Sequence, residues 1–371
     1  PAVVRLAVTP PTALLDETVV VRVSGLRPDQ EVVVRSSTPD GDAREWNAEA
    51  SFRADAKGVV DLSTQAAASG SYTGVDAMGL FWSARTATPM AFPRPISGTI
   101  ETRLEAVVDG KVVASATLAR QITTDDINVT EVKEDGLVGR LYEPSGTRHP
   151  AVLVLGGSEG GIPPTYASVL AGRGYVTFAL AYFRAEGLPK DLVEIPLEYF
   201  RSGIEWLRAR PSVDPERIAV LGISKGGELS LLLGATWPQV KAVIALSPSS
   251  GIELNPASSL DQPQAAAAAI AVEKIRGPVL LVSSRDDGMS PAAVMSDRVV
   301  ERLRTSGFAH PVEHLHYESC AHDLPDAWLP PSNGGTLGAA AEGTMRAYGD
   351  YWPKVRAFLE RAIGPAIARK R

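Results

Sequence analysis

A strand, a tight turn and a helix follow one another around residue 224, and this segment constrains the fold more than any other part of the sequence. The apolar run Arg217–Leu221 leads into Gly222–Gly226, which reads G-I-S-K-G, and the helical run Glu228–Leu233 follows. In so tight a turn, side chains two residues before and after the serine would collide with neighbouring backbone, so both positions need glycine. The pattern predicts that Ser224 is a nucleophile at the carboxyl edge of a sheet. The alternative is a tight turn with an idle serine.

The second half of the chain alternates apolar, strand-like runs with helical patterns. Helices are predicted near Tyr166–Arg173 and from about Leu192 to Ala209. The strand-like runs are Pro150–Leu155, Val176–Ala181, Arg217–Leu221, Ala242–Leu246 and Val279–Ser283. Continuous apolar strands separated by helices indicate a mostly parallel sheet covered by helices on both faces. With the serine turn, this alternation predicts an α/β protein and, within that class, the α/β-hydrolase fold.

The first half of the chain consists of short strand-like runs separated by turn residues. Examples are Val19–Val23, Glu31–Arg35, Thr102–Val108 and Val112–Ala116. No long amphipathic helix is predicted there, which is typical of a small β-sandwich. We therefore predict an N-terminal β-sandwich domain over residues 1–125 and an α/β-hydrolase catalytic domain over residues 126–371. The run Ala265–Ala269 is interpreted as a short helix or linker.

A nucleophilic serine needs a general base, and the base needs a carboxylate that orients it. In this fold the chain order is serine, then aspartate or glutamate, then histidine, which excludes His149. His314 and His316 alternate along an extended run and are interpreted as strand residues. His322 lies in the loop just beyond that run and is therefore the candidate base.

The orienting carboxylate should follow the preceding strand, where Asp286 and Asp287 are adjacent. Successive residues that leave a strand point in opposite directions, so only one of the two should face His322. We favour Asp287, with Asp286 as the alternative. The aspartate that does not face His322 would cap the loop or the helix before Pro291.

Two backbone N–H groups are expected to bind the oxyanion of a tetrahedral intermediate. One belongs to Lys225, and the other to the glycine-rich loop Gly156–Gly161 that follows an earlier strand. Glycines let this backbone approach a substrate closely, and Gly157 and Ser158 are the candidate donors. A nucleotide-phosphate loop is disfavoured because the loop has neither G-x-G-x-x-G nor the Walker lysine.

Composition excludes several classes of protein. The chain has 371 residues, a net charge of −6 and no basic block, so no nucleic-acid partner is expected. The apolar runs are too short to span a membrane and no signal segment opens the sequence, so a cytoplasmic protein is expected. The single cysteine, Cys320, excludes an intrachain disulfide and is interpreted as a packing residue. No metal site is predicted.

Several segments carry patterns specific enough to compare with known families. They are Met78–Ser83, Ala179–Phe183, Leu188–Lys190, Leu197–Phe200, Gly222–Leu229, and Glu318–His322 with a Gly334-Gly335 turn. Together they resemble the acyl-CoA thioesterases related to bile acid-CoA:amino acid N-acyltransferase over nearly the whole chain, and Gly222–Leu229 is the most specific. The chain departs from the family pattern in two places. The segment between Ser249 and Val272, where the family has a lid or pocket wall, is shorter. Near Ser284 the family usually has glycine.

The resemblance implies a serine–aspartate–histidine triad that acts on acyl-CoA thioesters, in agreement with Ser224, Asp287 and His322. No cofactor is expected, with coenzyme A present only as part of the substrate. The candidate substrate-binding residues are Phe81, Trp82 and Tyr182. Lys190 and Lys225 are candidate contacts for the coenzyme A phosphates, although solvated surface is the simpler interpretation.

Serine at position 224 favours hydrolysis, because the resemblance associates serine with the thioesterases and cysteine with the amino-acid acyltransferases. Transfer of the acyl group to an amine or alcohol stays open, since a dry pocket holding such an acceptor would use the same residues. An esterase or peptidase of the same fold is another alternative, as is a non-catalytic ligand-binding module. The sequence leaves the oligomeric state undetermined.

Overall fold

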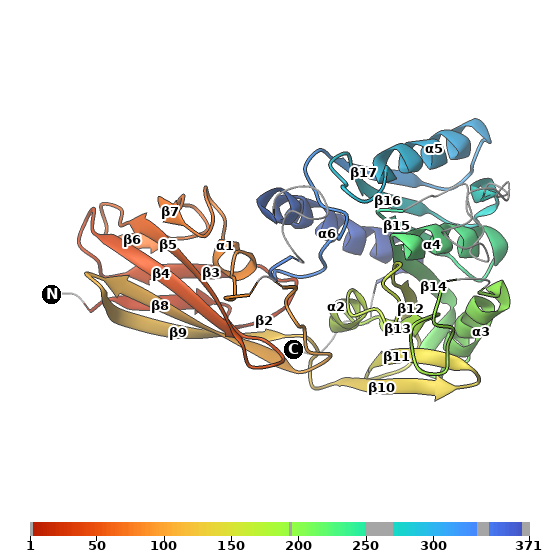
Figure 1. Ribbon diagram of the computed structural model, residues 1–371, viewed down its shortest axis with the longest axis horizontal. Helices are drawn as coiled ribbons and strands as arrows, with labels where there is room; N and C mark the ends of the chain where they lie inside the picture. The colour runs from red at the N-terminus through yellow and green to blue at the C-terminus, as the bar shows by residue number, and fades with distance from the viewer. Residues whose placement is uncertain (1–2, 89, 193–194, 249–269, 332–340, 366–371) are drawn as a thin grey trace. The chain divides into compact units, whose positions relative to one another are not determined.

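The computed structural model describes residues 3–88, 90–192, 195–248, 270–331 and 341–365 (Figure 1). The chain divides into two compact units, Pro1–Thr124 with Pro325–Gly334, and Asp125–Leu324 with Gly335–Arg371. The predicted helix or linker at Ala265–Ala269 and the Gly334-Gly335 turn lie outside the described residues, as does most of the shortened segment before Val272.

The first unit is a β-sandwich of two sheets. Its strands are β1 (Arg5–Thr9), β2 (Thr12–Leu14), β3 (Val20–Ser24), β4 (Glu31–Pro39), β5 (Glu45–Arg53), β6 (Val59–Asp61), β7 (Ser69–Gly70), β8 (Thr99–Val108) and β9 (Lys111–Gln121). The smaller sheet has the order β1-β3-β6 and the larger one β2-β9-β8-β4-β5-β7. In β4 and β5 every second side chain is buried, because one face of the sheet lies against the core. The predicted β-sandwich is confirmed, and the four predicted runs correspond to β3, β4, β8 and β9.

A segment from much later in the chain completes the first unit. Both carboxylate oxygens of Asp326 accept from Nη1 of Arg94, at 2.7 and 2.8 Å, and both side chains are almost fully buried. Arg120 donates to the carbonyl of Trp328, and the N–H of Trp328 donates to the carbonyl of Leu15 at 3.2 Å. The sequence alone did not indicate this return of the chain.

Phe81 and Trp82, two candidate substrate-binding residues, lie in the short helix α1 (Gly79–Trp82) and are buried. The guanidinium of Arg120 lies 5.1 Å from the ring centroid of Phe81, and the indole N–H of Trp82 donates to Asp76 at 2.8 Å. These contacts give both rings a packing role within the unit. Contact with a substrate stays a prediction.

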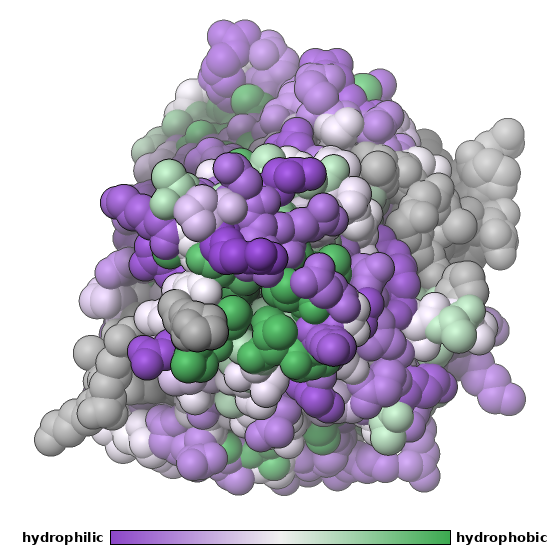
Figure 2. Space-filling view, turned by 90° about the vertical axis from the view of Figure 1, so that its left-hand side faces the viewer, coloured by the Kyte–Doolittle hydropathy of each residue, from purple (hydrophilic) through white to green (hydrophobic). Residues whose placement is uncertain are grey.

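Figure 2 shows the left-hand side of Figure 1, where an apolar area is enclosed by hydrophilic residues. Exposed apolar side chains of the first unit include Val3, Val20, Val112 and Val113. Nothing among the described residues shows what would cover this area, so it does not by itself indicate a binding surface. Within the described ranges, no helix is both long enough and apolar enough to cross a membrane.

The second unit is built on one eight-stranded sheet covered by helices. Its strands are β10 (Ile127–Glu134), β11 (Leu137–Pro144), β12 (His149–Leu155), β13 (Val176–Ala181), β14 (Val213–Ile223), β15 (Ala242–Leu246), β16 (Val279–Ser284) and β17 (Val312–Tyr317). The helices are α2 (Ala167–Gly172), α3 (Leu197–Arg208), α4 (Lys225–Thr236), η1 (Val272–Lys274), α5 (Ala292–Thr305) and α6 (Ala341–Ile363). The strand order is β10-β11-β13-β12-β14-β15-β16-β17, with antiparallel pairing up to β13 and parallel pairing beyond it. This confirms the predicted α/β-hydrolase fold.

The central strands β12, β13, β15 and β16 are buried at every position, as the continuous apolar runs predict for a sheet covered on both faces. One helix boundary differs from the prediction. Helix α3 begins at Leu197 rather than near Leu192, because Pro196 occupies its N-cap in an extended conformation. Proline has no N–H for a preceding turn of helix, so it marks a start rather than an interior position.

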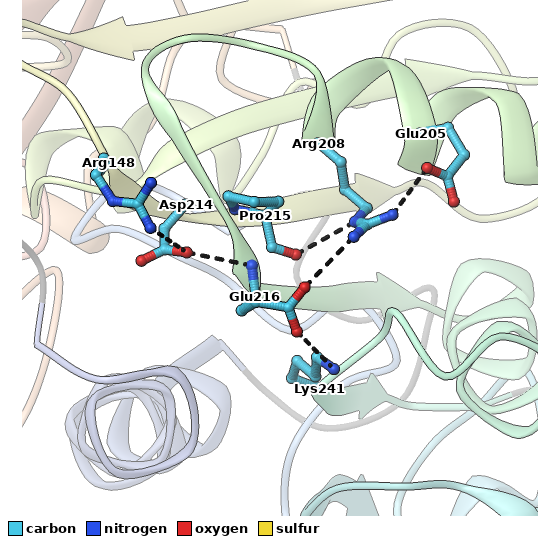
Figure 3. Close-up of polar contacts among 7 residues, drawn as sticks. All are labelled: Arg148, Glu205, Arg208, Asp214, Pro215, Glu216 and Lys241. Carbon is cyan, nitrogen blue, oxygen red and sulfur yellow. Dashed lines mark hydrogen bonds and ion pairs between the residues drawn. The ribbon is translucent and has the colours of Figure 1, made fainter.

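A network of ion pairs surrounds the amino end of β14 (Figure 3). Its pairs are Arg208 with Glu205 and Glu216, Glu216 with Lys241, and Arg148 with Asp214, at 2.9 to 3.5 Å. Arg208 also donates to the carbonyl of Pro215 at 3.2 Å, which joins α3 to the beginning of the strand. Most of these side chains are partly exposed, so the network positions β14 more than it stabilises the fold.

Candidate active site

Ser224 stands on the tight turn between β14 and α4. Its backbone has φ 56° and ψ −119°, a conformation that costs a non-glycine residue free energy and is concentrated at functional sites. Its N–H donates to the carbonyl of Leu246 in the neighbouring strand β15 at 2.8 Å. The serine is therefore fixed at the carboxyl edge of the sheet.

Two glycines make this turn possible. A Cβ added at Gly222 would lie 2.0 Å from the carbonyl oxygen of Gly226. A Cβ added at Gly226 would lie 2.4 Å from the carbonyl oxygens of Gly156 and Leu155. These separations are far inside van der Waals contact, and the atoms concerned are backbone. The steric reason for glycine on either side of the serine is thus confirmed.

Lys225 is the first residue of α4, so its N–H is among those that have no partner within the helix. The helix N-terminus also carries a partial positive charge, which suits an anion at this position. The side chain of Lys225 is buried, and its Nζ lies 2.6 Å from Oε1 of the buried Glu228. The interpretation of this lysine as solvated surface is therefore wrong, and its charge is paired inside the protein. Lys190 is exposed.

Asp287 and His322 meet where the loops after β16 and β17 come together. Oδ2 of Asp287 lies 2.7 Å from Nδ1 of His322, and the two side chains are 1% and 3% exposed. Oδ1 of Asp287 accepts N–H bonds from Met289 at 2.8 Å and Ser290 at 3.0 Å. The loop thus holds the carboxylate while the carboxylate holds the ring. An ionised Asp287 in this position keeps a proton on Nδ1 and leaves Nε2 as the acceptor.

Nε2 of His322 is buried and has no hydrogen-bond partner among the residues that the structure describes. It is therefore not bonded to the hydroxyl of Ser224 in this conformation. Ser224 and His322 are 9% and 2% exposed, so little water reaches either side chain. Catalytic hydrogen bonds are often long or poorly aligned without substrate and tighten when it binds. The nitrogen that would accept a proton is left available.

The alternative aspartate, Asp286, is exposed, and its N–H donates to Oγ of Ser284 at 3.2 Å. The same hydroxyl accepts the N–H of Cys320 at 3.0 Å. Ser284 therefore joins the loop that carries Asp287 to the loop that carries His322. The sequence marked this serine only as a departure from glycine.

The glycine-rich loop after β12 is held from two sides. Tyr182 donates its hydroxyl to the carbonyl of Gly156 at 2.7 Å and to that of Gly157 at 3.2 Å. The N–H of Gly157 donates to Oε1 of Glu159 at 2.9 Å. Burial, with the nearby charge of Glu159, raises the pKa of Tyr182 well above its ordinary value, so its hydroxyl remains a donor. Whether Tyr182 also contacts a substrate stays a prediction.

Gly157 also adjoins Ser224. A Cβ at this glycine would lie 3.0 Å from Cβ of Ser224 and 2.7 Å from Oε2 of Glu159. Loop backbone, serine and carboxylate are therefore immediate neighbours. Because the carboxylate already engages the N–H of Gly157, we favour the N–H of Ser158 as the second oxyanion donor. Glu159 was not singled out from the sequence, since its role depends on a local fold of the loop.

Cys320 is fully buried, two residues before His322. Burial raises the pKa of its thiol to about 12, with the Asp287 charge adding to this and a hydrogen bond with Thr344 opposing it. A thiol with so high a pKa is not a nucleophile at neutral pH. The structure supports its interpretation as a packing residue.

Fold and site together define an α/β hydrolase with a serine on the turn after the central strand β14 and a β-sandwich at its N-terminus. The model of the family "Acyl-CoA thioester hydrolase/BAAT N-terminal region" matches residues 16–134. The model of the family "BAAT / Acyl-CoA thioester hydrolase C terminal" matches residues 195–264 and 254–365. The chain belongs to this family of acyl-CoA thioester hydrolases and bile acid-CoA:amino acid N-acyltransferases, and it is an enzyme.

Individual relatives agree with the family. Mouse acyl-coenzyme A thioesterase 6 is 28% identical, over 94% of this chain and 94% of its own. Mouse mitochondrial acyl-coenzyme A thioesterase 2 is 26% identical, over 94% and 87%. Mouse bile acid-CoA:amino acid N-acyltransferase is 31% identical, over 68% and 63%. Among solved structures, the α/β hydrolase MGS-M1 from a Medee basin deep-sea metagenome library aligns with 65% of this chain and 99% of its own, at 18% identity and a TM-score of 0.47.

Proposed function

We propose that this enzyme hydrolyses acyl-CoA thioesters through an acyl-enzyme on Ser224, with His322 as general base and Asp287 as its orienting carboxylate. The observation that carries the proposal is the buried 2.7 Å contact between Asp287 and His322, at the carboxyl edge of the sheet that also bears Ser224. The names of the thioesterase relatives support acyl-CoA as the substrate class.

In the first half of the reaction, Oγ of Ser224 attacks the thioester carbonyl carbon while Nε2 of His322 takes the hydroxyl proton. The carbonyl oxygen becomes an oxyanion, which accepts hydrogen bonds from the N–H groups of Lys225 and Ser158. One such donor contributes about 10²–10³ in rate. Asp287 keeps the imidazole oriented and stabilises the imidazolium that forms.

In the second half, the tetrahedral intermediate collapses and the carbon–sulfur bond breaks. Coenzyme A departs as a thiol after protonation by His322, or as a thiolate, since an ordinary thiol pKa of about 8.5 makes it a good leaving group. In the second case the imidazolium of His322 loses its proton to solvent before water attacks. Water then attacks the acyl-enzyme while His322 accepts its proton. A second oxyanion forms and accepts hydrogen bonds from the same two N–H groups. As it collapses, His322 returns its proton to Oγ of Ser224, the carbon–oxygen bond to the serine breaks, and the acid is released.

The acceptor in the second half is the least constrained part of the proposal. Similarity to bile acid-CoA:amino acid N-acyltransferase favours one alternative, in which an amine replaces water. The residues would act in the same way, with His322 deprotonating the amine. Serine rather than cysteine at position 224 supports water as the acceptor, as the family resemblance implies.

Mass spectrometry of the intact protein, after incubation with mixed acyl-CoAs, tests the proposal directly. We expect an acyl adduct whose peptide maps to Ser224 and whose lifetime ends in free acid. Parallel incubations with glycine, taurine and an alcohol show whether the adduct is passed to an acceptor. Adducts that form only with p-nitrophenyl esters or peptide amides would point to another esterase or a peptidase. A folded protein that no fluorophosphonate labels at Ser224 would point to a ligand-binding module.

Substitution of Glu159 should identify the loop donor. Glu159→Ala removes the acceptor that fixes the N–H of Gly157, so the loop loses its position and kcat/KM for acyl-CoA should fall by about tenfold. Glu159→Gln keeps an acceptor oxygen and should change kcat/KM much less. Steady-state kinetics of both variants are compared with those of Glu186→Ala, an exposed glutamate whose partner is Lys133. A rise in kcat/KM for Glu159→Ala would instead show that the carboxylate competes with the oxyanion for the N–H of Gly157.

A further inference from the structure

A second group of ionisable side chains lies between β17 and α5, outside the residues used above. His314 and His316 are two residues apart on β17 and so project from one face of it, and Asp297 of α5 lies against them. One candidate ligand atom of each residue lies within 4.8 Å of the other two. We propose that these three residues bind a divalent transition-metal ion, with Zn²⁺ as the best match. The sequence alone had given no reason to expect a metal.

The separation of His314 and Asp297 fits two ligands of one ion better than a direct hydrogen bond. Nδ1 of His314 and Oδ1 of Asp297 are 3.4 Å apart. Charge-assisted N–H···O bonds are about 2.7–2.9 Å long, so this contact is too long for a good one. Two tetrahedral ligands that each lie about 2.0–2.1 Å from Zn²⁺ are about 3.4 Å from each other. A small movement of His316 would complete the set of two imidazoles and one carboxylate.

The surroundings of His314 are those of a metal ligand. Its other ring nitrogen, Nε2, lies 2.7 Å from Oγ of Ser283 on β16. A histidine ligand usually engages its second nitrogen in such a bond, which fixes the tautomer and the ring plane. Burial lowers the pKa of His314, while the Asp297 charge opposes this and His316 adds to it.

The other two residues supply an unsatisfied nitrogen and a route to solvent. Nε2 of His316 is buried and has no hydrogen-bond partner among the described residues, and an unpaired buried polar atom costs free energy. The rings of His314 and His316 are nearly parallel, with centroids 5.3 Å apart, so the two imidazoles lie side by side on this face of β17. Asp297 is 56% exposed, which gives an ion access and leaves room for a water ligand.

The position of the site gives the ion a structural role. The loop that ends in α5 carries Asp287, and the loop after β17 carries His322. An ion between β17 and α5 would tie together the two elements that support these loops. We therefore expect occupancy to stabilise the fold and leave the chemistry at Ser224 unchanged, so the inference does not depend on the proposed activity.

Metal titration of the full chain, freed of any affinity tag and stripped with a chelator, tests the site. We expect one Zn²⁺ per chain by isothermal titration calorimetry and a rise in Tm on binding. Co²⁺ should give the visible absorption of an ion with nitrogen and oxygen ligands in low coordination. The His314→Gln/His316→Gln variant should bind Zn²⁺ with an affinity more than about 100-fold lower than that of the wild type. Loss of a residue that only supports a ligand lowers affinity by about 10–100-fold, so a larger loss indicates that the ligands themselves were removed. The matched control His310→Gln, at an exposed histidine outside the group, should bind as the wild type does.

Two results would overturn the proposal: a wild-type chain that binds no Zn²⁺ at micromolar concentrations, or a double variant that keeps the wild-type affinity. The second would place any bound ion elsewhere, for example at His322. Should the double variant fail to fold, Asp297→Asn decides, because its exposed side chain can be changed without disturbing the core. We expect its affinity to fall at least about tenfold, and an unchanged affinity would remove Asp297 from the site and the proposal with it.

Discussion

Ser224→Ala should lower kcat/KM for acyl-CoA hydrolysis by about 10⁴-fold or more, the largest effect of any single substitution in this chain. The substitution removes the atom that forms the acyl-enzyme and leaves only the oxyanion donors and substrate binding to accelerate attack by water. It should also abolish the covalent adduct with acyl-CoA and with fluorophosphonates. Steady-state hydrolysis, followed through the released thiol, and intact-protein mass spectrometry measure the two effects.

Ser296→Ala is the matched control for this experiment. Ser296 is likewise buried, but it lies on α5 and its hydroxyl has no hydrogen-bond partner among the described residues. Its replacement should leave kcat/KM and labelling unchanged. Thermal unfolding of both variants separates loss of chemistry from loss of fold. Retention of more than about a tenth of the wild-type rate by folded Ser224→Ala would show that another residue is the nucleophile.

Asp287→Asn should lower kcat by about 10³–10⁴-fold, because an amide cannot hold the proton on Nδ1 of His322 in the way a carboxylate does. Oδ1 of Asp287 accepts two backbone N–H bonds, and an asparagine oxygen can keep them, so the loop should persist. The amide nitrogen of the asparagine would then face Nδ1 of His322. It would either oppose the N–H at Nδ1 or shift the ring proton to Nε2, which is the wrong tautomer for a base. Measurement of kcat with saturating acyl-CoA, together with a thermal melt, distinguishes this effect from unfolding.

Asp286→Asn gives a control one residue away with the same chemical change. Its side chain is exposed, and only its backbone N–H contacts Ser284. We expect kcat within about threefold of the wild-type value, as for an ordinary surface substitution. Equal losses in the two variants, or a larger loss for Asp286→Asn, would refute the assignment of Asp287 as the orienting carboxylate.

The parts of the fold that the sequence predicts are those governed by local rules. The buried strands β12, β13, β15 and β16 are recognisable in the sequence as continuous apolar runs. The tight turn at Ser224 is recognisable because its sterics demand glycine at positions 222 and 226. The chain order of the hydrolase fold then places His322 and the aspartate pair. Between Asp286 and Asp287, strand alternation supplied a preference, and the contact of Asp287 with the ring depends on how the two loops meet in the folded protein.

What the sequence did not predict depends on contacts between segments that are distant or irregular. Ser284 and Glu159 act through backbone N–H groups whose direction is set by loops, and the segment from Pro325 joins a unit that ends two hundred residues earlier. The burial of Lys225 depends on where the helix begins. The sequence placed Lys225 in the turn and the helical run from Glu228, whereas α4 begins at Lys225, so Glu228 follows it by three residues on one helix, which is the spacing of an ion pair.

The buried Lys225–Glu228 pair also bears on how ionic strength should act on this enzyme. The ammonium of Lys225 is neutralised by Glu228 within the protein. The turn at Ser224 therefore presents a developing oxyanion with amide dipoles, and the charge of Lys225 is not free to contact it. Dissolved ions screen exposed charges far more than buried ones. Added salt should therefore leave the rate at saturation nearly constant.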